Sequence, residues 1–243
     1  MSLVIPGMPR PSRLIVPGVA VHLIQRGNNR VACFRHDNDY LMYLAHLRQL
    51  AKKYDCAVHA YCLMTNHVYL LITPQAAGAC TALMRDLGQR YVQYFNRRHA
   101  RTGTLWEGRF RSCLTESALY VLGCYRYIEL NPVRAGVVDH PMGYLWSSYA
   151  VNGGMRSDPL ITPHPEFLAL GGAAESRHSA YRALFEQRLE PGLQKVIRDA
   201  TNGGYPLASE AFKAIVLAPS GYRTGPGDPG RPAKSPDALY ALE

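Results

Sequence analysis

The sequence predicts an α+β domain in which an antiparallel sheet carries helices on one face. Runs of β-branched and aliphatic residues alternate with stretches whose apolar residues recur every three or four positions, and turn-forming residues separate them. Up to Pro132 these runs follow the order β-α-β-β-α-β-α. This order is typical of the ferredoxin-like plan, and we expect the second face of the sheet to stay open for a ligand.

The first strand is expected at residues 19–25, where aliphatic residues precede the turn formers at 26–29. Asp37 or Asn38 is expected to cap a helix whose apolar stripe continues to about Tyr54. Two strands, a helix and a further strand follow at residues 57–63, 67–73, 79–98 and 109–114.

The last helix of this series is expected to begin at a cap formed by Thr115 or Ser117. It is expected to end at Pro132, because proline disfavours helical geometry in the residue before it.

We predict four regions. They are a main domain at residues 9–149, a connector at 150–178, a small helical region at 179–217 and a Gly/Pro-rich flexible tail at 218–243. The helical region is a candidate for DNA binding, because a Gly-Gly turn lies between two short helical stretches within residues 199–215, as in a helix-turn-helix.

The composition favours a globular protein that binds a polyanion. The net charge is +9, and residues 1–150 carry 17 Lys and Arg against 8 Asp and Glu, whereas residues 151–243 carry 10 against 10. A nucleic acid is the simplest partner for that excess. No apolar run is long enough for a membrane span and no secretory leader is evident, so a cytoplasmic location is expected. The six cysteines lack metal-site spacing and are expected to be reduced and buried.

Two segments place polar side chains where they can meet. In the strand at 67–73, His67 and Tyr69 face one way, while Val68, Leu70 and Ile72 face the core. On the last helix of the series, Tyr127 and Asn131 are four residues apart and share one face.

Four ordered motifs then carry a resemblance. The segments are AYCLMTNHVYLL at 60–71, YFNRR at 94–98, GTLWEGRF at 103–110 and YIELNPVRAG at 127–136. Together they resemble the REP-associated tyrosine transposases, which belong to the IS200-like, single-tyrosine HUH transposase superfamily. The likeness runs from about residue 9 to residue 149.

The resemblance implies a single-strand DNA endonuclease and strand transferase. Tyr127 falls on the nucleophile that becomes linked to a 5′ phosphate and leaves a free 3′ hydroxyl. His67 and Asn131 fall on ligands of a divalent metal, Mg²⁺ or Mn²⁺, which polarises the scissile phosphate. The implied partner is single-stranded or hairpin DNA with palindromic repeats, and no association with a membrane is expected. The protein is expected to be a monomer or homodimer.

Tyr69 departs from the family pattern, because it stands where the second metal-binding histidine is expected. A neutral phenol is a much poorer ligand for these metals than an imidazole. Three interpretations are open: a weakened enzyme, an enzyme that uses the Tyr69 phenolate or another group such as His59 or Glu129, and a domain that binds DNA without cutting it.

Cations interleaved with aromatic residues predict the DNA contacts, because this combination grips phosphates and stacks on unpaired bases. The candidates are Arg26, Arg97, Arg98, Arg101, Trp106, Arg109 and Arg111, with Arg231 in a Gly-Arg-Pro segment that resembles a minor-groove arm. The rival from another class is a non-catalytic protein that binds DNA repeats or structured RNA on the same sheet. Aromatic RNA-binding motifs of the RRM kind are not evident in the strands, which counts against the RNA version.

Overall fold

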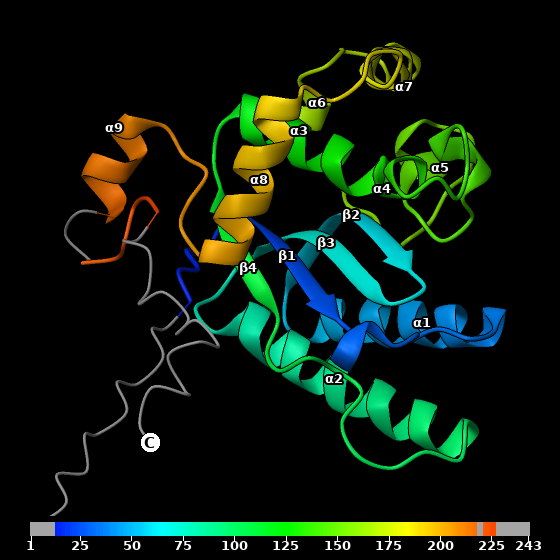
Figure 1. Ribbon diagram of the computed structural model, residues 1–243. Coiled ribbons are helices and arrows are strands. Elements are labelled where there is room, and N and C mark those ends of the chain that lie inside the picture. The colour runs from blue at the N-terminus through cyan, green and yellow to red at the C-terminus, as the bar shows by residue number, and fades with distance from the viewer. Residues whose placement is uncertain (1–12, 218–220, 227–243) are drawn as a thin grey trace, which may run out of the picture.

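A computed structural model describes residues 13–217 and 221–226 of the chain (Figure 1). Its strands are β1 (Ala20–Arg26), β2 (Cys56–Met64), β3 (His67–Pro74) and β4 (Arg111–Thr115). The longer helices are α1 (Asp37–Lys53), α2 (Ala79–Arg98), α3 (Ala118–Glu129), α7 (Ala174–Ala183) and α8 (Pro191–Gly203). The short helical elements are η1 (Asn28–Arg30), α4 (Asn131–Arg134), η2 (Pro141–Gly143), α5 (Tyr149–Asn152), α6 (Pro165–Leu168), α9 (Glu210–Phe212) and η3 (Lys213–Leu217).

The four strands form one sheet in the order β2-β3-β1-β4, and each neighbouring pair is antiparallel. This order, together with the helices that link the strands, confirms the predicted α+β, ferredoxin-like plan. In the β1–β3 register Arg26 lies opposite His67 and Ile24 lies opposite Tyr69. The register therefore places side chains from the end of β1 beside the start of β3.

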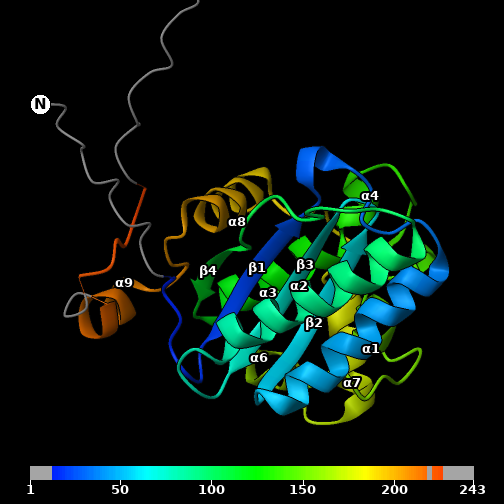
Figure 2. The ribbon, with the colours of Figure 1, turned by 90° about the horizontal axis from the view of Figure 1, so that it is seen from below.

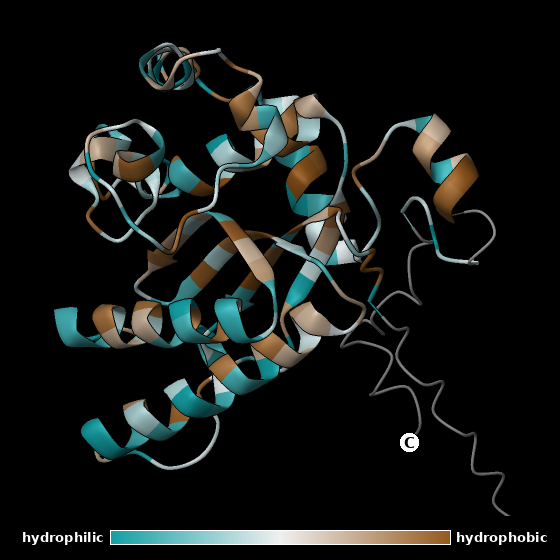
Figure 3. Ribbon diagram, turned by 180° about the vertical axis from the view of Figure 1, so that it is seen from behind, coloured by the Kyte–Doolittle hydropathy of each residue, from teal (hydrophilic) through white to brown (hydrophobic). Residues whose placement is uncertain are grey.

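Helices α1 and α2 cover one face of the sheet and lie side by side across it (Figure 2). Val68, Leu70 and Ile72 of β3 point into the core below these helices, as the alternation in that strand predicts. The strands are mostly apolar, whereas α1 and α2 alternate between apolar and polar segments (Figure 3). Such a stripe is typical of a helix that buries one side against a sheet.

The expectation of an open second face is wrong. Helices α3 and α8 pack on that face, where Leu71 of β3, Ile128 of α3 and Ile197 of α8 share a second apolar core (Figure 1). The reason lies in the strands, because β3 is apolar on both faces and a sheet exposing Leu71 to water would lose the stabilisation that its burial supplies.

Three boundaries differ from the predictions. The N-cap of α1 is His36, and Asp39 in the first turn accepts hydrogen bonds from the backbone N–H groups of Arg35 and His36 at 2.8 and 3.2 Å. The strand predicted near residues 109–114 is Arg111–Thr115. Helix α3 ends before Pro132, which instead lies in the first turn of α4. Proline fits there because the first turn needs no backbone donor.

The predicted cap of α3 is correct in position but not in mechanism. Ser117 is the N-cap residue, but its backbone has a φ of 83° and its side chain makes no capping hydrogen bond. Thr115 instead ends β4 and is buried.

The C-terminal helices are part of the same packed body as the sheet. Helix α8 contacts β4 and α3, so it closes the edge of the second face. The hypothesised helix-turn-helix is wrong, because an extended segment after Gly204 pairs with β4 through a Leu207–Thr115 bridge before the three-residue α9 begins. The four-region division stays a prediction. Most of the predicted tail at 218–243, and Arg231 within it, lies outside the described residues.

All six cysteines are buried and unpaired, which confirms the expectation of reduced thiols in the core. Within the described ranges, no helix combines the length and apolarity that a membrane crossing needs.

Candidate functional site

His67 is the first residue of β3, directly after the turn that joins it to β2. Its Nδ1–H donates to Asn66 Oδ1 at 2.6 Å, which leaves the lone pair on Nε2. That nitrogen lies 3.4 Å from Asn131 Nδ2 on α4. Burial lowers the pKa of His67 to about 4, and the nearby positive charge of Arg26 is the second cause. The imidazole is therefore neutral at pH 7 and can accept a hydrogen bond or bind a metal through Nε2.

Tyr69 and Tyr127 meet next to His67. The Tyr69 ring lies edge-on to the rings of His67 and Tyr127, with centroids 5.2 and 5.6 Å apart. Both tyrosines are buried. Burial, followed by the proximity of Tyr127, raises the pKa of Tyr69, so its phenol stays protonated at neutral pH.

Arg134 holds a cation over this cluster from the end of α4. Its guanidinium carbon lies 4.3 Å from the centre of the Tyr127 ring, and its Nη2 donates to the Tyr127 carbonyl oxygen at 2.6 Å. The arginine therefore fixes the end of α3 and places positive charge beside the phenol.

The structure thus brings together the four predicted residues His67, Tyr69, Tyr127 and Asn131 from β3, α3 and α4. Sequence reasoning missed a fifth member. His22 of β1 is fully buried, stacks on the Tyr69 ring at 5.6 Å and lies edge-on to Tyr127 at the same distance.

His22 has a defined hydrogen-bond geometry. Its Nδ1 lies 2.7 Å from Thr201 Oγ1, whose own hydroxyl donates to the Ile197 carbonyl oxygen, so Nδ1 carries the proton. The lone pair is then on Nε2, which has no partner within the described part of the chain. Burial lowers the pKa of His22 to about 3. The signal in the sequence was the alternation of β1, which puts His22 on the same face as Tyr69 once the register is known.

The donor set fits a divalent metal only in part. His67 offers an oriented imidazole nitrogen, and a half-turn of the Asn131 amide would present its oxygen beside that nitrogen. Tyr69, the third candidate, is held protonated by burial. Over residues 13–217 and 221–226 no cluster of three or more His, Cys, Asp or Glu side chains is able to hold a metal ion. A metal here would take most of its ligands from water and substrate.

His59 and Glu129, the two alternative ligands, make hydrogen bonds to other parts of the protein. His59 bonds to Thr73 Oγ1 and to the Thr162 carbonyl oxygen at 2.8 and 2.7 Å. Glu129 is fully buried and accepts hydrogen bonds from Ser148, Asn152 and Tyr181. Neither arrangement includes His67, so their proposed substitution for the missing histidine is wrong.

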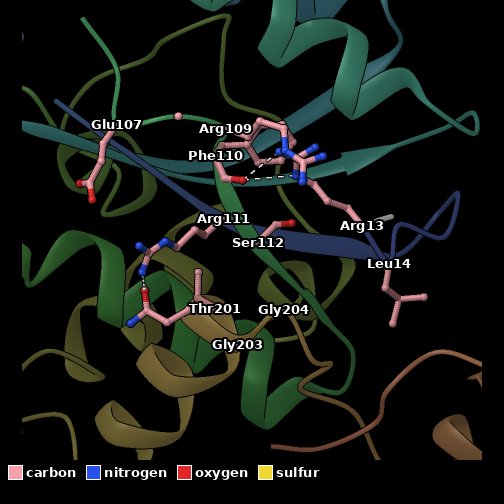
Figure 4. A pocket seen from close by; sticks show the side chains of 12 residues that line it. Arg13, Leu14, Glu107, Arg109, Phe110, Arg111, Ser112, Thr201, Gly203 and Gly204 are labelled. Atoms are coloured by element: carbon pink, nitrogen blue, oxygen red, sulfur yellow. Dashed lines mark hydrogen bonds between the residues drawn. The ribbon is translucent and has the colours of Figure 1, made fainter. Parts of the chain in front are cut away.

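The predicted cationic residues fall into two groups. Arg26, Arg109 and Arg111, with Arg198 of α8, line a cavity of about 260 Å³ at the edge of the sheet. Arg109 and Arg111 also line an adjoining cavity of about 760 Å³ between β4 and the end of α8, together with Arg13 (Figure 4). The two cavities share Arg109 and Arg111 in their walls, and we call them together the β4 groove. Inside it Arg111 Nη1 donates to Asn202 Oδ1 at 2.9 Å.

The second group lies at the end of α2. Arg97 and Arg98 are exposed in its last turn, and Arg98 lines a separate pocket between α1 and α2. Arg101 is half-buried, 5.6 Å from the Phe95 ring centre. Trp106 departs from the expectation of an exposed stacking platform, because it is 6% exposed and packs on Tyr91.

No curated protein matches the sequence. A solved REP-associated tyrosine transposase bound to a REP hairpin is similar over 65% of this chain and 93% of its own, with 15% identity and a TM-score of 0.52, which shows a shared fold. A transposase-type protein from Deinococcus radiodurans is 23% identical over 53% of this chain and 92% of its own, with a TM-score of 0.35. Residues 15–131, which contain β1 to α3 and Asn131, match the model of the family described as "Transposase IS200 like", so this stretch of the chain is similar to that family.

Proposed function

We propose that this protein is a transposase-like endonuclease and strand transferase that acts on single-stranded or hairpin DNA with palindromic repeats. The observation that carries the proposal is the meeting of His67, Tyr127 and Asn131 around Tyr69, which unites an imidazole, a phenol and an amide from three elements. One chain supplies all of them, so a monomer carries the full set, and a homodimer would carry two.

Tyr127 is the proposed nucleophile. Its phenolic oxygen forms a bond to phosphorus, the bond from phosphorus to the 3′ oxygen breaks, and the DNA is left as a 5′ phosphotyrosine and a free 3′ hydroxyl. Overall, one proton passes from the phenol to the departing 3′ oxygen. The phosphotyrosine keeps the energy of the broken bond, so a 3′ hydroxyl can reverse the step without ATP.

His67 and Asn131 would hold a divalent metal, Mg²⁺ or Mn²⁺, which supplies charge stabilisation at the scissile phosphate. The Asn66 side chain keeps His67 in the tautomer that presents Nε2. Arg26 and Arg134 add two cations near the cluster and would offset the charge of the phosphate.

The β4 groove supports the DNA part of the proposal. Arg26, Arg109 and Arg111 line it from the strand side and Arg198 from α8. Because Arg26 pairs in register with His67, a backbone held in the groove would reach the cluster. The solved REP-associated transposase is named as bound to a REP hairpin, and we propose the same class of partner here.

A second candidate function is DNA-hairpin binding with weak or no cleavage. The observation that favours it is the buried, protonated phenol of Tyr69 at the position of the second histidine. In this account the protein would recognise repeats and leave them intact.

One experiment separates the two. The protein is incubated with end-labelled hairpin oligonucleotides and Mn²⁺, and a denaturing gel is searched for a covalent adduct that Tyr127→Phe removes. Tyr120→Phe, on the same helix, is the matched control and keeps the adduct. If the wild type forms no adduct but Tyr69→His does, the binding account is correct. If neither forms one, the nuclease proposal fails.

A further inference from the structure

A further cavity lies next to the β4 groove, between α2 and the segment that leads into β4. Its volume is about 520 Å³, within the range of small-molecule sites. We call it the α2 cavity. Its walls include Gln25, Met84, Gly88, Val92, Trp106 and Phe110. It is separate from the tyrosine cluster, and its walls include Trp106 and Arg109 of the predicted DNA contacts.

Two buried polar atoms in its wall have no hydrogen-bond partner among the described residues: Gln25 Oε1 and Trp106 Nε1. Gln25 is 7% exposed and Trp106 is 6% exposed. A buried polar group left unpaired destabilises the folded chain. Both residues line the cavity, so this donor and this acceptor lie in its wall.

Gly88 adds a third local cost. It lies in the middle of α2, where glycine is less favourable than alanine. A Cβ at this position would meet Trp106 Nε1 at 3.7 Å, an ordinary contact, so the folded chain has room for alanine. Packing therefore does not require the glycine, and a methyl group here would lie against the Trp106 and Gln25 side chains in the cavity wall.

The chemistry of the cavity matches a nucleobase. Every base presents neighbouring donors and acceptors on one edge and apolar faces above and below, and the Gln25 amide can turn to serve either role. Met84, Val92 and Phe110 supply apolar walls.

The cavity also opens beside cations that suit a phosphate. Arg13, Arg109 and Phe110 line both the α2 cavity and the β4 groove. The Arg13 guanidinium stacks 3.7 Å from the Phe110 ring centre and donates to its carbonyl oxygen (Figure 4). A base in the α2 cavity could therefore belong to a DNA strand whose phosphate backbone lies in the β4 groove.

We propose that the α2 cavity binds one unpaired base of the DNA whose backbone occupies the β4 groove, with Trp106 Nε1–H and Gln25 as its hydrogen-bond partners. This rests on the proposed function for the DNA, and it adds a recognition site that does not take part in cleavage.

Binding of hairpin oligonucleotides without metal tests the proposal. Single bases of the unpaired segments are replaced one at a time by abasic sites, and affinities are measured for the wild type, Gly88→Ala and Gln25→Met. We expect one position whose base contributes about 5- to 100-fold to wild-type affinity. Both variants lose that contribution and become insensitive to the abasic site there, while their melting temperatures stay equal or rise.

Two matched controls accompany these variants. Gly192→Ala places a methyl group in open space on α8, and Gln49→Met changes an exposed residue of α1. Both are expected to bind and discriminate as the wild type does. If Gly88→Ala and Gln25→Met also do so, the cavity proposal is overturned while hairpin binding stands. If no variant or wild type binds any hairpin, the proposed function and the cavity proposal both fail.

Fluorescence gives an independent readout, because the chain has two tryptophans and Trp146→Phe leaves Trp106 as the reporter. Trp146 stacks on Tyr40, away from the cavity wall, and phenylalanine preserves that contact. Addition of the hairpin should change the Trp106 emission, and Gly88→Ala should abolish the change. An emission change of equal size in both proteins contradicts a base at Trp106.

Discussion

Both faces of the central sheet are buried, but they differ in what they bury. Under α1 and α2 the core consists of aliphatic and aromatic side chains such as Leu47, Leu70 and Phe95. Under α3 and α8 the core also contains His22, Tyr127 and other polar groups. Burying polar groups costs free energy unless they are paired, and both faces leave some unpaired: Gln25 Oε1 and Trp106 Nε1 on the α2 side, and His22 Nε2 on the second face. The difference lies in the kind of group: the second face gathers His22, Tyr69 and Tyr127 in one cluster, and the side chains of that cluster can take part in chemistry.

Truncation of a core residue on each face gives the largest expected contrast. Leu47→Ala on the α1 side should lower the free energy of unfolding by about 3 kcal/mol, because it leaves a cavity in a tightly packed core. Tyr127→Phe on the other side removes one hydroxyl and should cost about 1 kcal/mol or less. Urea unfolding measures both. Equal losses would mean that the Tyr127 hydroxyl is a structural group, and the contrast between the faces would disappear.

The pH dependence of stability sharpens the contrast, because the second face buries Glu129. Burial raises its pKa to about 7 from a normal value of 4.5, so the folded protein holds a proton that the unfolded chain loses between these values. This contribution to stability is complete below about pH 4.5 and is lost as the pH rises to about 7, a change of about 3 kcal/mol. The buried His22 acts in the opposite direction, since its pKa is lowered to about 3 and its contribution is lost as the pH falls below 6.5.

Glu129→Gln isolates the carboxyl group from the histidines. The glutamine amide can still bond to Ser148, Asn152 and Tyr181 and does not titrate. The stability of the variant relative to the wild type should therefore increase by about 3 kcal/mol between pH 4.5 and pH 8. A relative stability that is constant over this range would show that Glu129 is not desolvated as the packing of α3 indicates.

Tyr69→His tests the chemistry of the second face with a smaller expected effect. A second imidazole beside His67 should lower the Mn²⁺ concentration needed for half-maximal adduct by about ten-fold. Tyr69→Phe is the matched control and should leave that concentration unchanged, because the protonated phenol is a poor ligand. Identical metal dependence in the histidine and phenylalanine variants would place the metal away from Tyr69.

Substitution of a cation in the β4 groove, at the edge of the sheet, should have the smallest effect of these changes. Arg111 lines the β4 groove, whereas Arg97 lies at the end of α2. Arg111→Ala should weaken hairpin binding by about 1 kcal/mol and reduce the slope of log affinity against log salt by about one. Arg97→Ala should have a smaller effect on both quantities. The reverse ranking would move the DNA path from the β4 edge to the end of α2.

Local patterns in the sequence predict the α1 side of the molecule well. Both limits of α2 and the inward residues of β3 follow from periodicity, because each repeats over several turns or pleats. The cover of the second face could not be predicted in this way. Helix α8 begins more than a hundred residues after β3, and periodicity says only that it has an apolar side, not which surface that side contacts.

The candidate site shows the same division. His67 and Tyr127 could be named from motifs, but the inclusion of His22 required the β1–β3 register, since a lone histidine in an apolar strand carries no sign of its neighbours. Trp106 shows the converse. Its place among cations favours a surface that stacks on bases, yet contacts with Tyr43 and Tyr91 bury its ring, and its N–H is buried without a hydrogen-bond partner among the described residues.

The most direct test of the central claim is to identify the residue that carries the DNA. The covalent adduct formed with a hairpin oligonucleotide and Mn²⁺ is digested with nuclease and protease, and the peptide that retains a nucleotide is sequenced by mass spectrometry. The account predicts a 5′-linked nucleotide on Tyr127 and none on Tyr120 or Tyr125 of the same helix. A nucleotide on any other residue, or no adduct from the wild type and Tyr69→His alike, would contradict it.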